Sequence, residues 1–372
     1  MIYLDYQATT PVAPEVAEAM RPWIEEKFAN PHSPSRWGRE AAAAIEVARK
    51  QVEQAIGPSG GRVAFTGSAT EALNWALKGT MENAPPSRRR IVTVATEHAA
   101  VLDTCEWLEA QGCAVTRLPV NTGGLVDLED VRAAVDRTVA VVAVMLVNNE
   151  IGVVQPIAEI ASIAHEAGAL MLCDAVQGFG RLSIPEGPDL IAVSAHKIHG
   201  PKAIGALWMR NGAEPAPLIH GGGQELGIRS GTLSPALCVG FGTAAKLAAG
   251  RREADHAHVE MLWNAALGQL SPGWTVNGSA DHRYRGNLNI RHDRLDAARL
   301  ISDLRDIAFS LGSACASGSG RPSHVLRAVG LSDREARSSI RLGFGRYTGA
   351  DELIDAVRRI DTAARGQQGL AA

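Results

Sequence analysis

The sequence predicts an α/β fold in which a mostly parallel, seven-stranded sheet is covered by helices. Two observations lead to this prediction. Between residues 62 and 210, short runs rich in apolar and β-branched residues alternate with longer helical stretches, a pattern typical of parallel sheets with helices on both faces. The chain has 372 residues, of which 46% are hydrophobic and 21% are charged, so it can bury one large core and a smaller one.

Seven runs are the candidates for strands of the sheet. They are Arg62–Thr66, Ile91–Ala95, Ala114–Val120, Val139–Val147, Ala169–Asp174, Leu190–Ser194 and Gly205–Met209. Helical stretches separate several of these runs, including Ala99–Gln111 and Ile157–Ala167, the second of which carries isoleucines at helical spacing. Ligands of such sheets bind beyond the carboxyl ends of the strands, so the residues that follow each strand are the candidates for chemistry.

The pattern changes from about Gly240 onward. A charged helical stretch is expected around Ala248–Leu270, followed by a loop rich in glycine and proline and by shorter strands such as Gly286–Ile290 and Ser339–Phe344. These features predict a second, smaller α+β domain. The expected boundaries are residues 15–245 for the large domain, and residues 246–372 together with residues 1–14 for the small one.

Charge and cysteine content narrow the class of protein. The net charge of −3 gives no reason to expect nucleic acid as a partner, and the basic run Arg88–Arg90 is short enough to be a solvated strand entrance. The longest apolar run, Val139–Val147, is far shorter than the ~20 residues that span a bilayer. Five cysteines without a CxxC pair, and a start without a secretory pattern, favour a reducing cytoplasm.

The turn Gly67–Glu71 follows the first strand of the sheet and leads into a helix. Small hydroxyl residues and a glycine at a helix N-terminus present N–H groups at the positive end of the helix dipole, which favours an anion such as phosphate. An ordinary N-cap, with Glu71 in a capping box, is the alternative.

Two later strands end in residues with stronger chemistry. Ala169–Asp174 ends in a carboxylate, with Gln177 shortly after it, and the next strand leads directly into Ser194-Ala195-His196-Lys197. A lysine in a partly buried position is the usual Schiff-base former. A phosphate cradle, a carboxylate and such a lysine together suit pyridoxal 5'-phosphate, because they serve its phosphate, its ring nitrogen and its aldehyde.

Other motifs would indicate a serine nucleophile, a zinc site or nucleotide binding, but each of these has less support. Gly57–Gly61 matches GxSxG, but it lies between a helix and a strand, the reverse of a nucleophile elbow. His196, His199 and His220 lack the carboxylate or cysteine that would complete a zinc pattern. The sequence has neither a Walker A motif nor a GxGxxG after a strand, so nucleotide binding has little support.

Motifs spread over nearly the whole chain give a more specific signal. They are Tyr3–Pro11, Gly67–Glu71, Thr96–His98, Val147–Gly152, Asp174 with Gln177, Ser194–Lys197, Gly221–Glu225, Arg229–Thr232, the loop of Cys315 with Pro322–Arg327, and Ser339–Arg341. In these motifs the chain resembles the cysteine desulfurases, the class V branch of the fold-type I pyridoxal phosphate enzymes. The resemblance implies that fold and that cofactor.

The resemblance also implies the roles of individual residues. Lys197 is expected to form the Schiff base, His98 to stack on the cofactor and relay protons, and Cys315 to attack the substrate sulfur. Arg341 is expected to bind the substrate carboxylate, with Asn149 close to the substrate. The residues that the resemblance assigns to cofactor binding are Ala69, Thr70, His98, Asn149, Asp174, Gln177, Ser194, His196, Lys197 and Thr232.

By the same resemblance, the expected reaction removes sulfur from L-cysteine and gives L-alanine and a persulfide on Cys315. The small residues around Cys315 are consistent with an accessible loop that can carry the sulfur away. Thr232 is expected to reach the phosphate in another subunit, which implies a homodimer. The persulfide would supply an iron–sulfur scaffold or another acceptor protein, which no motif identifies. The alternatives are a selenocysteine lyase or another lyase or aminotransferase of the same class, and a non-catalytic sulfur-carrier subunit.

Overall fold

The computed structural model describes residues 1–312 and 322–369. Its large sheet has seven strands in the order β2-β8-β7-β6-β5-β3-β4, and only β8 runs antiparallel to its neighbours. The strands of this sheet are β2 (Gly61–Thr66), β3 (Arg90–Val94), β4 (Ala114–Leu118), β5 (Val139–Met145), β6 (Leu170–Asp174), β7 (Leu190–Ser194) and β8 (Gly205–Arg210). The predicted fold class, including a mostly parallel sheet of seven strands, is confirmed.

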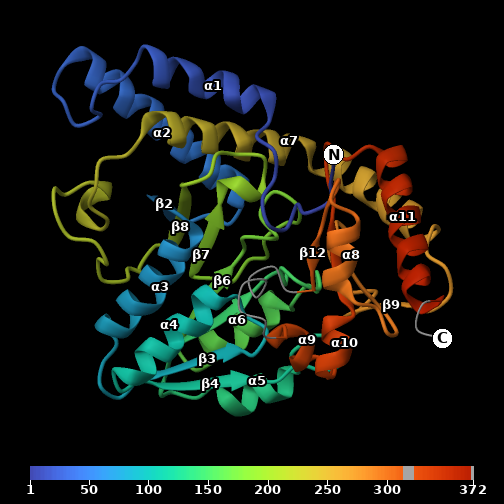
Figure 1. Cartoon of the computed structure of the whole chain (residues 1–372). Helices are drawn as coiled ribbons and strands as arrows, with labels where there is room; N and C mark the ends of the chain where they lie inside the picture. Colours follow the sequence, from blue (N-terminus) through green and yellow to red (C-terminus); the bar gives the residue numbers. More distant parts are fainter. Residues whose placement is uncertain (313–321, 370–372) are drawn as a thin grey trace.

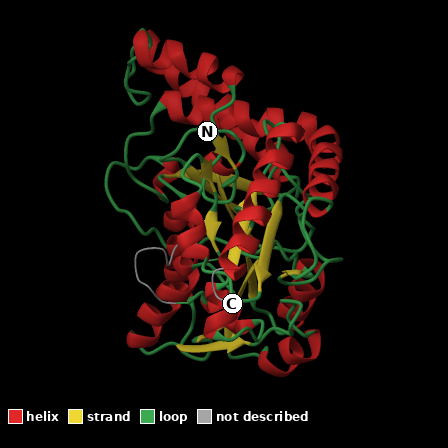
Figure 2. Cartoon of the chain, turned by 45° about the vertical axis from the view of Figure 1, so that its right-hand side comes forward, coloured by secondary structure: helices red, strands yellow, loops and turns green. Residues whose placement is uncertain are grey.

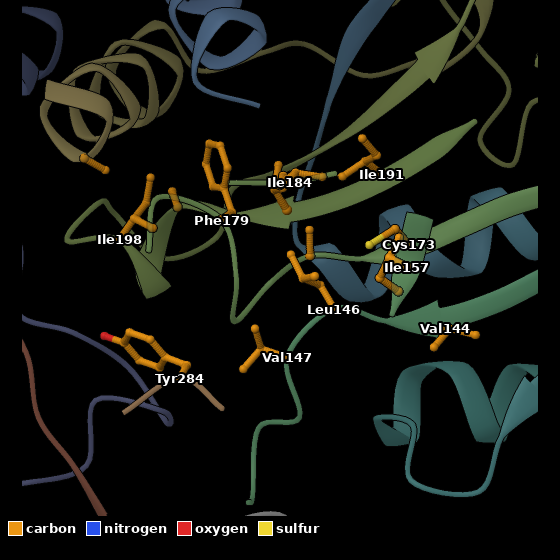
Figure 3. Packing of buried hydrophobic residues seen from close by; sticks show 14 of the residues in the cluster. Val144, Leu146, Val147, Ile157, Cys173, Phe179, Ile184, Ile191, Ile198 and Tyr284 are labelled. Carbon is orange, nitrogen blue, oxygen red and sulfur yellow. The ribbon is translucent and has the colours of Figure 1, made fainter. Parts of the chain in front are cut away.

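Helices cover both faces of the sheet (Figures 1 and 2). They are α1 (Pro14–Glu25), α2 (Arg36–Ile56), α3 (Ala69–Asn83), α4 (Ala99–Ala110), α5 (Leu128–Ala134), α6 (Ile157–Glu166) and α7 (Pro235–Leu267). All residues of β5 are buried, and residues 141–144 alternate between two cores: Val141 and Ala143 share one core with α3 and α4, whereas Val142 and Val144 share the other with α2, α6 and α7. Figure 3 shows the second core around Val144, where apolar side chains of neighbouring strands and turns meet.

Helix α7 differs from the expectation, because it begins at Pro235 rather than near Ala248 and runs without interruption across residue 245. Its first half contains Gly240 and Gly242, which weaken helices in isolation. Here both are needed for close packing. A Cβ on Gly240 would lie 2.6 Å from the sulfur of Met20, and one on Gly242 would lie 2.6 Å from the Cα of Ala48. Tertiary contact therefore overrides local propensity at this point.

The C-terminal part forms a four-stranded antiparallel sheet in the order β12-β13-β10-β9. The N-terminus joins this part of the molecule, because β1 pairs in parallel with β11 through Ile2 and Ile307. The remaining strands are β1 (Ile2–Tyr3), β9 (Trp274–Val276), β10 (Asn287–His292), β11 (Ile307–Ala308), β12 (Ser310–Leu311) and β13 (Ser339–Gly343). The remaining helices are α8 (Ala297–Asp303), α9 (His324–Ala328), α10 (Asp333–Arg337), α11 (Ala350–Gly369) and the short 3-10 turns η1 (Ala195–Lys197) and η2 (Glu225–Gly227).

These connections bring β1 and α11 to one side of the large sheet (Figure 1). The segment after β1 then runs past η1, where Thr10 exchanges hydrogen bonds with the backbone of His196 and His199. In the described part of the chain, no helix combines the length and apolar character needed to cross a membrane. The arrangement places residues 5–10, the ends of β6 and β7, and β13 around a common space.

Candidate active site

A cavity of about 640 Å³ lies at the carboxyl ends of β6 and β7. Ten of the residues predicted from the sequence line it: Ala69, Thr70, His98, Asn149, Asp174, Gln177, Ser194, His196, Lys197 and Arg341. Gln7, Ala8 and Thr9 of the N-terminal segment complete one wall. The residues named from strand ends and motifs are thus brought together in space.

The turn between β2 and α3 forms one end of the cavity. The Ser68 hydroxyl accepts a hydrogen bond from the Glu71 N–H (3.2 Å), and the Glu71 carboxylate accepts one from the Gly67 N–H (2.7 Å). The cap and an anion site can coexist here, because Ala69 and Thr70, in the first turn of α3, line the cavity. Strand β8 approaches this turn so closely that a Cβ on Gly205 would lie 2.6 Å from the Ala69 nitrogen.

Asp174 is the last residue of β6 and is buried. One carboxylate oxygen accepts a hydrogen bond from the Val176 N–H at 3.0 Å. Burial raises the pKa of this carboxyl group, and the nearby His98 and Lys197 oppose that effect. A cation placed against Asp174 would therefore gain from the low dielectric of the site.

Lys197 follows β7 within the turn η1. Its Nζ donates hydrogen bonds to the backbone carbonyl oxygens of Gln7 and of Ala8, the second at 2.8 Å. The Gln7 carbonyl also accepts a hydrogen bond from the Gln177 side-chain amide at 3.0 Å. The N-terminal segment consequently fixes the position of the amine.

The two histidines of the cavity are both held in one orientation. His98 caps α4, because its Nδ1 accepts a hydrogen bond from the Ala100 N–H at 3.0 Å. Burial lowers the pKa of His98, and that of His196 is lowered to about 4, chiefly by burial and then by the Lys197 charge. The His196 Nδ1 lies 3.1 Å from the Thr9 hydroxyl. Both rings are therefore neutral near pH 7.

Arg341 lies on β13 and its side chain is 1% exposed. Its two terminal nitrogens donate hydrogen bonds to the Asp5 carboxylate (2.7 Å) and to the Asn149 carbonyl (3.0 Å). Its Nε is buried and has no hydrogen-bond partner among the described residues. A guanidinium with donors to spare at the cavity wall is suited to a carboxylate ligand.

The sequence reasoning missed several contributors to the site. Backbone carbonyls of Gln7 and Ala8 carry no residue-type signal, so no pattern could have singled them out. Lys202 also lines the cavity. Its position in the sequence, shortly after Lys197, could have indicated this. Glu97 precedes His98 and lies outside the cavity lining; it is buried, one of its carboxylate oxygens has no partner among the described residues, and burial raises its pKa well above the usual range.

Two predicted residues are not among the described residues that line the cavity, for different reasons. Thr232 is exposed and lies outside it. Cys315 lies outside the described residues. The segments on either side of residues 313–321 do contact the site: the Ser310 hydroxyl accepts a hydrogen bond from Arg341 (3.3 Å), and the His324 ring lies 2.9 Å from the Glu97 carbonyl.

Comparison with known proteins gives a consistent result. The model of the family "Aminotransferase class-V" matches residues 2–356. The chain is 45% identical to cysteine desulfurase IscS of Rickettsia bellii and 44% identical to that of Rickettsia africae, over 96% of this chain and 90% of each relative. A solved NifS-like protein covers 98% of the chain and is itself covered to 99%, with a TM-score of 0.91 at 32% identity.

A second solved structure, "SspA in complex with cysteine", is 35% identical to the chain with a TM-score of 0.83. The match spans 94% of this chain and all of that one. Because the family model and the relatives match almost from end to end, the chain belongs to the cysteine desulfurases of the class-V aminotransferase family.

Proposed function

We propose that the cavity binds pyridoxal 5'-phosphate and that the protein removes sulfur from L-cysteine, giving L-alanine and a persulfide on Cys315. The observation that carries the proposal is the meeting of Lys197, Asp174 and the α3 N-terminus in one cavity whose wall also holds Arg341. Each part of the cofactor and the substrate then has a group of the right charge beside it.

The residues present fit the cofactor. Ala69 and Thr70 at the positive end of α3, with Ser194, His196 and Lys202 nearby, suit a phosphate. Asp174 suits a protonated ring nitrogen, since a buried carboxylate stabilises a cation held against it. When bound, the cofactor supplies an aldehyde for Lys197 and a ring that accepts electrons from the substrate α-carbon.

Lys197 acts as the base at the substrate. Two backbone carbonyls hold its amine at the cavity wall, so little rotational freedom is lost when the amine takes the α-proton. The neutral ring of His98 is held at its Nδ1 by the Ala100 N–H, which fixes the ring at the cavity for stacking and proton transfer.

Arg341 orients the substrate through its carboxylate. In the free protein Asp5 and the Asn149 carbonyl hold the guanidinium in place, so the fork is preorganised before the substrate arrives. The side chain of Asn149 lies in the same wall of the cavity, where its amide can bind the substrate as well.

The sulfur transfer step uses Cys315. Its thiolate attacks the substrate sulfur, the S–S bond forms as the C–S bond breaks, and the electron pair of that bond remains on the substrate carbon, which takes up a proton. Arg341 and Glu97 contact the described residues on either side of residues 313–321, which supports the delivery of Cys315 to this cavity.

The proposal also includes the oligomeric state of the protein and the acceptor of its sulfur. We assign a homodimer in which Thr232 serves the phosphate site of the other subunit, since Thr232 is exposed and lies outside the cavity of its own chain. The persulfide passes to an acceptor such as an iron–sulfur scaffold protein. The reducing cytoplasm suits this thiol chemistry, and the four described cysteines are free and buried.

The test supplies purified protein with L-cysteine and a thiol reductant, and measures alanine and sulfide. Wild type is expected to release equal amounts of both. Cys315→Ser is expected to release neither while it keeps the visible absorbance of the cofactor. Sulfide release by Cys315→Ser at the wild-type rate, or pyruvate in place of alanine, would contradict the proposed transfer.

A further inference from the structure

Arg181 occupies an unusual position immediately behind the wall of the cavity. It follows β6 by one turn, is largely buried, and forms no ion pair with any described residue. Its guanidinium instead packs over the ring of Tyr284, with 5.2 Å between the Cζ atom and the ring centroid. Burying a cation without a carboxylate partner costs free energy. The hydrogen-bond acceptors of its N–H groups must therefore offset part of this cost.

The guanidinium joins three segments of the site. One terminal nitrogen donates to the side-chain oxygen of Gln177 (2.6 Å) and to its backbone carbonyl (3.3 Å). The other donates to the backbone carbonyls of Lys197 (3.0 Å) and Tyr6 (3.4 Å). Arg181 does not line the cavity itself, so it acts on the site through these groups.

These contacts distinguish the oxygen of the Gln177 side-chain amide from its nitrogen. Arginine has only donors, so the Gln177 atom that it binds must be the oxygen. A backbone carbonyl has only acceptors, so the Gln177 atom that faces the Gln7 carbonyl must be the nitrogen. The partners of the Gln177 oxygen and nitrogen therefore exclude the flipped orientation of the amide.

In this orientation the Gln177 amide can donate a hydrogen bond into the cavity. The Gln177 nitrogen has two N–H bonds, and only one is used by the Gln7 carbonyl. Its oxygen, in contrast, is occupied by Arg181. Because Gln177 lines the cavity, the group it can offer to a ligand is the second N–H, which stabilises an anionic oxygen.

We propose that Arg181 is a positioning residue that locks the Gln177 amide with its N–H toward the cavity, and so sets the proton affinity of the lysine imine. The inference rests on the proposed function, because it requires the cofactor and its ring oxygen at this place. A donor to the ring oxygen favours the unprotonated imine, in which that oxygen carries more negative charge. Losing the donor therefore raises the pH at which the imine loses its proton.

The experiment is a pH titration of the visible absorbance of the cofactor-loaded protein. Arg181→Lys keeps the positive charge but loses the planar fork that binds the Gln177 oxygen. Its midpoint is expected to rise by about one pH unit, the size expected for one lost hydrogen bond to a charged group. Gln177→Met is expected to shift the midpoint equally, and the double variant no further.

Arg283→Lys is the matched control. Arg283 is also buried, forms no ion pair with a described residue, donates to backbone carbonyls such as that of Ile151 (2.8 Å), and packs over Trp263. It does not line the cavity. A purely structural role for Arg181 predicts that both variants lower the melting temperature and leave the midpoint unchanged.

A wild-type midpoint in Arg181→Lys, or additive shifts in the double variant, would overturn the proposal. If Arg181→Lys does not fold, Gln177→Glu replaces it, because its carboxylate can pair with Arg181 and yet has no N–H for the cavity. Its midpoint is expected to rise, and an unchanged midpoint would count equally against the inference. Failure of the proposed function looks different: wild type would then show no imine band that Lys197→Ala abolishes.

Discussion

Arg341 illustrates how a single buried side chain can be prepared for a ligand. Asp5 and the Asn149 carbonyl take donors from its two terminal nitrogens, and its Nε has no partner among the described residues. We expect Arg341→Lys to raise the KM for L-cysteine by about tenfold or more, because lysine cannot bind a carboxylate through two parallel hydrogen bonds.

Steady-state alanine formation measures this effect, and Arg346→Lys is the control. Arg346 is also buried and binds a carboxylate, that of Asp255, through two nitrogens, but it lies outside the large cavity. An unchanged KM in Arg341→Lys, or an equal rise in both variants, would contradict the assigned role.

His199 makes the stability of the protein sensitive to acid. Its Nδ1 lies 3.0 Å from the Pro11 carbonyl, its ring packs against Tyr347, and burial lowers its pKa to about 4. The unfolded chain takes up this proton near pH 6.5 and the folded one does not, so stability falls as the pH decreases from about 6.5 to 4. One buried histidine accounts for ~3 kcal/mol of this loss.

His199→Asn tests this assignment, since asparagine tolerates the left-handed backbone found here, where φ is 66°. Between pH 7 and pH 4.5, its free energy of unfolding in urea is expected to fall by clearly less than that of wild type. The exposed His220 provides the control variant His220→Asn. Parallel pH profiles of wild type and His199→Asn would disprove the contribution.

At the scale of residues, sequence alone was informative where chemistry lies in the side chain. Lys197, Asp174 and the turn around Ala69 stand at strand ends, and the structure places them in one cavity. Sequence could not reveal that the Gln7 and Ala8 carbonyls hold Lys197, because any residue has a carbonyl. Arg181 was hidden for a similar reason, since its role depends on its neighbours in space.

At the scale of elements, two ion pairs fasten the irregular segment of η2 to the helices α2 and α3. Arg49 of α2 binds Glu225 through both terminal nitrogens (2.6 and 2.7 Å), and Arg229 binds Glu71 through its Nε and one terminal nitrogen (2.7 and 3.0 Å). Glu225 has a φ of 48°, so these contacts hold a backbone that would otherwise relax.

Arg49→Ala is expected to lower the free energy of unfolding by about 3 kcal/mol, because it leaves the Glu225 side chain, only 3% exposed, without its cation. Arg62→Ala is the matched control on β2, where the Arg62–Glu214 pair is exposed and should contribute under about 1 kcal/mol. Urea denaturation distinguishes the two, and equal losses would refute the argument.

The strands themselves were predictable because both of their faces are buried. A continuous apolar run such as Val139–Met145 predicts a strand that is buried on both faces, because an exposed face would carry polar residues at every second position. The start of α7 was not, because Gly240 and Gly242 look like helix breakers until Met20 and Ala48 are seen beside them. A local pattern cannot report which distant helix needs a small neighbour.

At the scale of the whole molecule, several large apolar side chains are exposed on or next to α1, α2 and the segment of η2. Phe28 is 88% exposed, Trp37 74% and Leu226 83%, and the helices α1 and α2 lie on the same side of the molecule as the segment of η2 (Figure 1). Exposed aromatic residues of this size are typical of interfaces. The segment of η2 leads directly to Thr232, which ties this surface to the proposed homodimer.

We expect wild type to sediment as a dimer and Trp37→Asp to shift toward monomer with a weaker affinity for the cofactor. Trp107→Asp is the control, since Trp107 is also exposed but belongs to α4. Analytical ultracentrifugation and cofactor titration measure both effects. A wild-type monomer that binds the cofactor fully would contradict the shared site.

The route of the chain through the cavity also has a consequence for the order of synthesis. Gln7 and Ala8, which hold Lys197, are synthesised long before Arg341, although Arg341 lies beside the same N-terminal segment in the folded protein and binds Asp5. The part of the cavity that contains Arg341 cannot form until β13 has been made, because Asp5 and the Asn149 carbonyl hold the guanidinium there. The part of the site assigned to the substrate carboxylate is therefore the last to form, after the residues proposed to hold the cofactor have been made.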